Sequence, residues 1–153
     1  MSEQEAQQPA MPVFNIEKIY VKDLSVEVPN APGIFLEREA PQIDIQLNSQ
    51  SAPVEEGVYQ TLLTINVTAK VQDKTAFMVE LQQAGIFRAE NIPAEAMEPM
   101  LAVGCPNILF PYAREAISDA VLRAGFPPML LQPVNFEALY LQQKQAQAGQ
   151  APH

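Results

Sequence analysis

The residue types that could do covalent chemistry come together in one stretch, CPNILFPYARE, residues 105–115. It holds the only cysteine of the chain, Cys105, and ends with Arg114 and Glu115. A cysteine can act as a nucleophile when a helix N-terminus or a nearby cation favours its thiolate. The stretch therefore has two possible roles, as the site of a thiol enzyme or as the beginning of a helix built for packing.

The partners that such chemistry requires are missing from the sequence. The only histidine is His153, the last residue of a tail that we expect to be disordered, which excludes an ordered Cys–His or Ser–His pair. No C-x-x-C, H-E-x-x-H, G-x-G-x-x-G or Gly-rich phosphate-binding motif occurs. Glu55 and Glu56 precede Gly57, which is typical of a solvated turn rather than of an acid–base pair. We therefore expect no catalytic residue, no metal site and no cofactor.

Packing explains Cys105 better than catalysis does. Its neighbours include Val103, Pro106 and Leu109, and a free cysteine often behaves as a small buried apolar residue. Apolar positions continue at helical spacing as far as Ala124, so we interpret the stretch as the kinked beginning of a long helix. A thiol enzyme that uses Cys105 is the least favoured alternative.

Composition and charge describe a single acidic domain. The chain has 153 residues, of which 48% are hydrophobic, and a formal net charge of −9. This length suits one domain with a substantial core. The negative charge disfavours nucleic acid or an anionic membrane surface as a partner and suits a basic protein. The N-terminus lacks the apolar core of a signal peptide, and no window approaches the ~18 apolar residues of a membrane span. We predict a cytoplasmic protein that does not insert into the membrane.

The first half of the chain alternates between apolar and polar residues, as half-buried strands do. Even positions from Phe14 to Val28 are mostly apolar, and Ile19 and Val21 interrupt this pattern, so we predict a bulge or a bend between its two halves. Further strands are predicted over residues 42–48, 58–71 and 75–83. Short connections between four consecutive strands favour an antiparallel sheet.

Helical spacing replaces this alternation in the second half. A short or irregular helix is predicted over residues 93–104, because Pro99 interrupts it and Gly104 is a plausible stop. A long helix follows and is closed by Gly125, and Asn135 is a candidate cap for a C-terminal helix. Strands followed by helices predict an α+β fold, in which a four-stranded antiparallel sheet has the long helix and the C-terminal helix packed on one face.

The two ends of the chain differ in composition from the region between them. Residues 1–12 are rich in Gln, Glu, Ala and Pro, and residues 145–153 are rich in Gln and Ala. Segments of this kind bury too little apolar surface to fold. We therefore predict a disordered tail over residues 1–12, one folded domain over 13–144, and a second disordered tail over 145–153.

Two surface features suit binding rather than catalysis. By strand parity, Asp23 and Glu27 share the polar face of the first strand, and Met78 and Glu80 share the face of the fourth strand opposite its apolar positions. An acidic face suits a basic partner. The alternative is an ordinary solvated sheet face that carries one exposed Met. Aromatic residues near loops and helix ends could line a groove for extended apolar peptide, although core packing is the simpler explanation for any single one. The groove candidates are Phe35, Tyr59, Ile108, Phe110, Tyr112, Phe136 and Tyr140.

Four segments of the chain resemble the SecB family of bacterial preprotein export chaperones. They are IYVKDLSVEVPNAPGIF, ELQQAGIF, CPNILFPYAREAISDAV and FPPMLLQPVNFEALYLQQ, in this order. The similarity runs from about Val13 to Lys144, so it covers nearly the whole predicted domain. CPNILFPYARE and PVNFEALY are specific to this family.

The resemblance implies both a fold and a function. SecB-like proteins are α+β chains that assemble as a dimer of dimers, a homotetramer with helices between two outer sheets. They are not enzymes. They bind non-native preproteins in hydrophobic grooves without ATP, keep them competent for translocation and deliver them to the motor ATPase SecA. The residues that match SecA docking are Asp23, Glu27, Met78 and Glu80, and those that match the tetramer-sensitive strand are Val79, Leu81 and Gln83.

Two other functions stay open at this point. A SecB-like chaperone devoted to a toxin–antitoxin pair would have the same fold, and its clients or its neighbouring genes would distinguish it. A purely structural subunit would have no affinity for unfolded chains.

Overall fold

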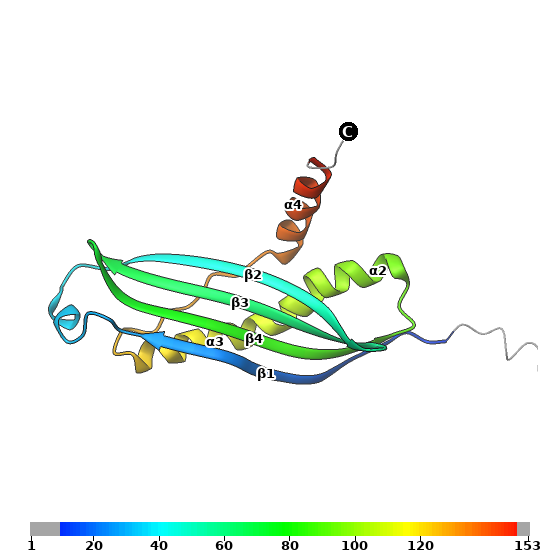
Figure 1. Cartoon of the computed structure of the whole chain (residues 1–153), viewed down its shortest axis with the longest axis horizontal. Helices are drawn as coiled ribbons and strands as arrows, with labels where there is room; N and C mark the ends of the chain where they lie inside the picture. The colour runs from blue at the N-terminus through cyan, green and yellow to red at the C-terminus, as the bar shows by residue number, and fades with distance from the viewer. Residues whose placement is uncertain (1–9, 150–153) are drawn as a thin grey trace, which may run out of the picture.

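Four long strands form one antiparallel sheet, and helices cover one of its faces (Figure 1). The computed structural model describes residues 10–149. The strands are β1 (Val13–Glu27), β2 (Gln42–Glu55), β3 (Val58–Val71) and β4 (Lys74–Glu90), and their order in the sheet is β1-β4-β3-β2. A short 3-10 helix, η1 (Gly33–Leu36), lies between β1 and β2. The predicted α+β fold is confirmed.

The helical half of the chain is more continuous than the sequence indicates. Its elements are α2 (Ala94–Pro99), the π-helical turn η2 (Met100–Gly104), α3 (Cys105–Arg123) and α4 (Phe136–Gly149). The expected stop at Gly104 is wrong, because this residue keeps helical backbone angles and α2, η2 and α3 follow one another without a break. Gly125 does close α3: its φ is 98°, and the amides of Gly125 and Phe126 donate to the carbonyls of Leu122 and Val121.

Two bulges keep the apolar side chains of β1 on the helix-covered face. The register between β1 and β4 shifts between Ile16 and Lys18, and again between Val21 and Asp23. Each extra residue reverses the alternation. Apolar residues therefore face the helices at even positions before the first bulge, at Ile19 and Val21 between the bulges, and at even positions again afterwards. The predicted bulge is confirmed and proves to be a pair.

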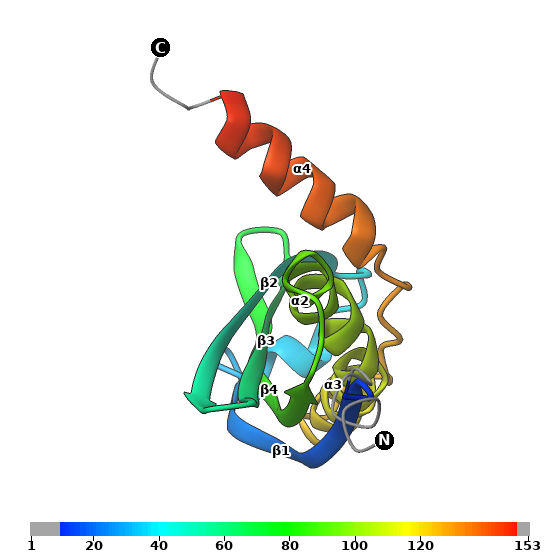
Figure 2. The same ribbon diagram turned by 90° about the vertical axis from the view of Figure 1, so that its right-hand side faces the viewer.

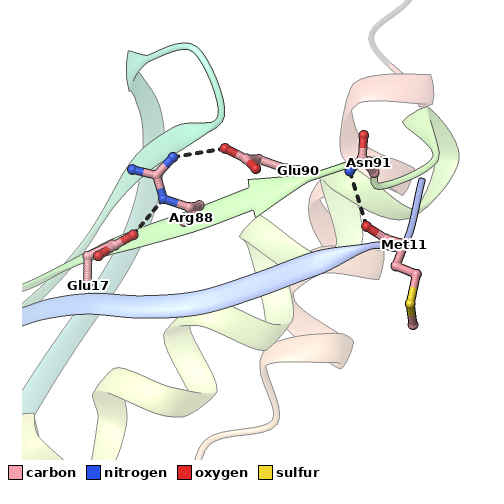
Figure 3. Close-up of polar contacts among 5 residues, drawn as sticks. All are labelled: Met11, Glu17, Arg88, Glu90 and Asn91. Carbon is pink, nitrogen blue, oxygen red and sulfur yellow. Dashed lines mark hydrogen bonds and ion pairs between the residues drawn. The ribbon is translucent and has the colours of Figure 1, made fainter.

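Arg88 fixes the first of these bulges (Figure 3). Its Nε donates to Oε1 of Glu17, the bulged residue, at 2.6 Å, and its Nη1 donates to Oε1 of Glu90 at 2.8 Å. Beside this cluster, Asn91 Nδ2 donates to the Met11 carbonyl at 3.1 Å and holds the chain just before β1 against the end of β4. Exposed ion pairs contribute little stability individually, and the pair between Arg88 and Glu17 joins β4 to β1 at the point where the register changes.

The helix layer covers only the middle of the sheet. α3 packs mainly on β4 and β3, where Leu109, Ala113 and Ile117 are fully buried against the strands. The inner face of the edge strand β1 stays partly uncovered, with side chains that are 36–49% exposed. These are Phe14, Ile16, Val21, Leu24 and Val26. The sheet therefore presents an apolar strip along β1 that α3 covers only in part.

Three elements extend further than their sequence pattern indicates. β2 continues to Glu55 because β3 pairs with it throughout, and Pro53 is tolerated because β2 is an edge strand. β4 continues to Glu90 because β1 and β3 pair with it on both sides. α4 reaches Gly149, so residues 145–149 of the expected C-terminal tail are helical. Residues 1–9 and 150–153 of the two expected tails lie outside the described residues.

Candidate functional site

Cys105 is buried inside the continuous helical segment. Its backbone N–H donates to the Met100 carbonyl, so no free helix N-terminus faces the thiol. Burial raises the pKa of the Cys105 thiol to about 11, because the charged thiolate would lose its solvation there. A thiol that stays protonated is a poor nucleophile, so this environment supports packing rather than catalysis. Among residues 10–149, no group of three or more His, Cys, Asp and Glu is placed to hold a metal ion.

The raised pKa of Cys105 predicts a specific loss of stability in alkali. The thiol has an ordinary pKa of 9.0 and a pKa of about 11 in the folded chain. Between these values the unfolded chain binds fewer protons than the folded chain does, so stability falls as the pH rises. We expect the wild type to lose about 2 kcal/mol more than Cys105→Ala between pH 8.5 and 11, measured by urea unfolding at each pH.

The two proteins differ only at this position, so the difference between their two stability curves reports on Cys105. Parallel curves would contradict the assignment. Cys105→Ala should also bind an unfolded preprotein as tightly as the wild type does, an outcome that a thiol enzyme does not predict.

An apolar groove of about 670 Å³ lies between the edge strand β2, the α2–η2 segment and α4. Figure 2 shows how α4 projects beyond the sheet on the side of β2 and α2. The lining residues are Leu47, Ser49, Gln50 and Ser51 from β2, Ile92, Ala94, Met97, Glu98, Leu101 and Ala102 from the α2–η2 side, and Phe136, Leu139, Tyr140 and Gln143 from α4. The lining combines apolar side chains with hydroxyl and amide groups, and Glu98 is its only charged member.

The first turn of α4 is anchored, while the rest of this helix projects from the body. Asn135 is the N-cap, as predicted, because its Oδ1 accepts the Ala138 N–H at 2.9 Å. Phe136 is 3% exposed and meets the Phe110 ring edge-on, with 6.0 Å between ring centroids. Across the groove, Lys144 Nζ lies 3.7 Å from Glu98 Oε2, so one weak ion pair joins α4 to α2.

Two of the seven groove candidates, Phe136 and Tyr140, line this groove. The other five lie elsewhere. Phe35 packs on Phe126, and Tyr59 lies beside the β2–β3 hairpin. Ile108 and Phe110 pack in the core, and Tyr112 is exposed on α3. Client contact by these five stays a prediction. Sequence reasoning missed Met97, Leu101 and Leu139. Leu139 repeats at i+3 from Phe136, and Met97 and Leu101 are four residues apart across Pro99, so helical spacing contained a signal for all three.

The four residues of the candidate docking face come together on the sheet. Glu27 lies directly opposite Met78, and Asp23 lies opposite Gln82, two residues beyond Glu80 on β4. Residues opposite one another in an antiparallel pair point to the same face, so all four share the face that the helices leave open. The three carboxylates are exposed and Met78 is half-buried. We call Asp23, Glu27, Met78 and Glu80 the acidic sheet face.

The residues matched to the tetramer-sensitive strand point the other way. Val79 and Leu81 are fully buried beneath the helix layer, and Gln83 is 3% exposed. Gln83 Nε2 donates to the Tyr20 carbonyl at 3.1 Å, next to the second bulge of β1. Any influence of these residues on assembly must therefore pass through the position of β1 and α3.

Comparisons with known proteins agree over nearly the whole chain. The family described as preprotein translocase subunit SecB matches residues 5–147. The protein-export protein SecB of Dechloromonas aromatica is 66% identical over 143 residues, which cover 94% of both chains. The protein of the same name from Chromobacterium violaceum is 59% identical over 153 residues, which cover 99% of this chain and 100% of the relative.

A solved structure has the same fold at much lower sequence identity. It is a SecB-like chaperone of Mycobacterium tuberculosis in complex with a peptide from an antitoxin. It superposes with a TM-score of 0.65 at 16% identity and covers 79% of this chain and 90% of its own. Within residues 10–149 no helix is long and apolar enough to cross a membrane. From the family match and these relatives, we conclude that the chain belongs to the SecB family.

Proposed function

We propose that this chain is an ATP-independent export chaperone of the cytoplasm, which holds non-native preproteins in its apolar groove and delivers them to SecA. The observation that carries the proposal is the groove between β2, α2–η2 and α4, in a chain of the SecB family. Holding an unfolded chain requires exposed apolar surface rather than a catalytic group. We accordingly propose that the chain has no enzymatic activity.

The chemistry of the groove indicates which client segments it prefers. Its lining is mostly apolar, its one charge is the carboxylate of Glu98, and the whole chain carries a net charge of −9. Client segments that combine apolar with basic residues suit this surface. One such groove binds weakly, but several grooves that hold the same unfolded chain bind with avidity.

A matched pair of substitutions on α4 tests the groove. Leu139 lines it and is 38% exposed, whereas Leu141 is 51% exposed on the same helix and is not among the lining residues. Contact with a leucine side chain contributes about 1.5–3 kcal/mol. Leu139→Asp is therefore expected to weaken binding of an unfolded preprotein at least about tenfold, while Leu141→Asp leaves it nearly unchanged. Fluorescence anisotropy titrations with a labelled, urea-unfolded precursor measure both. Equal affinities for the two variants would exclude this groove as the binding site.

The apolar strip along β1 supports assembly into a dimer of dimers. Five apolar side chains of β1 face the helix side of the sheet and stay 36–49% exposed. A second copy of the chain would remove this surface from water, which favours association. Native mass spectrometry is expected to give the mass of four chains. Val79 and Leu81 pair with Val26 and Leu24 of β1, so truncating either one should weaken the assembly by displacing β1.

The acidic sheet face supports a role in docking SecA. Its carboxylates are exposed, and its cross-strand neighbours Ser25, Asn66 and Thr68 are uncharged. A basic segment of the partner would therefore meet an unneutralised acidic surface with one apolar contact, Met78. The client groove lies at the edge strand β2, so the same molecule can engage a client and SecA at different places.

A further inference from the structure

The π-turn in the wall of the groove takes the α-helical donor away from the Leu101 carbonyl. The Cys105 N–H, which an α-helix would direct to Leu101, donates instead to Met100. In the π register the donor for Leu101 would be residue 106, but Pro106 has no N–H. A carbonyl left unpaired in a partly buried place is costly. The Leu101 carbonyl therefore requires a donor from outside the helix.

Ser51, on the edge strand β2, supplies that donor. Its hydroxyl donates to the Leu101 carbonyl at 3.2 Å. Ser51 has a single hydroxyl proton. The 2.7 Å bond between Ser51 Oγ and Thr61 Oγ1 is therefore donated by Thr61, which lies directly opposite on β3 and is fully buried. Ser51 and Leu101 both line the groove, so this hydrogen bond joins its floor directly to its wall.

Leu101 and Val103 of the π-turn pack against the core only in part. Neither α2 nor η2 has a fully buried residue, and the ion pair between Lys144 and Glu98 is exposed. We propose that Ser51 is a positioning residue for client binding, which holds the π-turn, and α2 with it, at the width that admits client side chains. The inference rests on the proposed function of the groove. Ser51 contributes to the affinity for clients indirectly, through its hydrogen bond to the Leu101 carbonyl.

Ser51→Ala and Ser49→Ala form a matched pair. Ser49 lines the same groove two residues earlier on β2, but the hydrogen bond to Leu101 comes from Ser51. Ser51→Ala is expected to weaken binding of a urea-unfolded precursor about three- to tenfold, the effect of one hydrogen bond. Ser49→Ala leaves the bond between Ser51 and the Leu101 carbonyl in place, so it should weaken binding clearly less than Ser51→Ala does. The conservative variant Ser51→Thr, which keeps a hydroxyl at this position, should bind as the wild type does. Hydrogen–deuterium exchange should accelerate in α2–η2 of Ser51→Ala and stay unchanged in β3 and β4.

The outcomes separate this inference from the function on which it rests. If the wild type does not bind the unfolded precursor, the proposed function fails. If the wild type binds and Leu139→Asp weakens binding, but Ser51→Ala matches Ser49→Ala, the groove stands and the positioning role of Ser51 is refuted.

Discussion

Replacing Gly85 with valine is expected to prevent the chain from folding stably. A Cβ at this position would lie 2.8 Å from Phe87 Cε2 and 2.9 Å from Leu109 Cδ2. Both side chains are fully buried, so neither can move into solvent. Overpacking by one methyl group costs about 1–3 kcal/mol, which we expect for Gly85→Ala. The two further methyl groups of valine should cost several times as much, out of a total stability of about 5–15 kcal/mol.

Gly104→Ala is the matched control, because this substitution is expected to raise the free energy of unfolding rather than lower it. Gly104 has helical backbone angles, and the nearest atom to an added Cβ is Met100 Cγ at 3.8 Å, an ordinary contact. Alanine in a helix is about 1 kcal/mol more favourable than glycine. Urea unfolding at one fixed protein concentration compares the variants, because assembly adds to apparent stability. A midpoint for Gly85→Ala at or above that of the wild type would show that α3 moves away from β4 at little cost.

The sheet was predictable because its information is local. Alternation with a period of two is visible in any strand with one buried face, and it assigned Asp23, Glu27, Met78 and Glu80 to one face before any pairing was known. Bulges are less visible, because one extra residue only reverses the alternation. Ile19 and Val21 revealed the irregularity in β1, but its two exact positions depend on the register with β4.

The groove was less predictable because it is made by contacts distant in sequence. β2 forms its floor, and η2 and α4 form its walls. Ser49 and Ser51 are polar, so the periodicity of apolar residues does not identify them as lining residues. The π-turn has no simple sequence signature either. Pro99 and Pro106 indicate a disturbed helix, but the hydrogen bond that Ser51 donates to the Leu101 carbonyl comes from 50 residues earlier. Local propensity favours a stop at Gly104, and it contains no information on contacts with distant strands.

The largest change in partner binding is expected from charge reversal on the acidic sheet face. Glu80 is exposed near the middle of β4, with Ser25 of β1 and Asn66 of β3 opposite it. In Glu80→Lys, a basic segment of SecA would meet a positive charge at the centre of the docking surface that we propose, and like charges held together are strongly unfavourable. We expect affinity for SecA to fall at least about tenfold at low salt, measured by isothermal titration calorimetry. Affinity for an unfolded preprotein should not change, because the groove lies at β2.

Asp44→Lys is the control that separates docking from net charge. Asp44 lies opposite Thr68, which in turn lies opposite Met78, so it occupies the same face two strands away. Both substitutions change the net charge of the chain by the same amount. Both should therefore reduce the rate of association with a basic partner to a similar extent. Asp23→Ala should weaken SecA binding in the same direction as Glu80→Lys, though less. An equal loss in Asp44→Lys would mean that the overall field, rather than the acidic sheet face, recruits SecA. If both Asp23→Ala and Glu80→Lys left the affinity for SecA unchanged, SecA would not bind this surface.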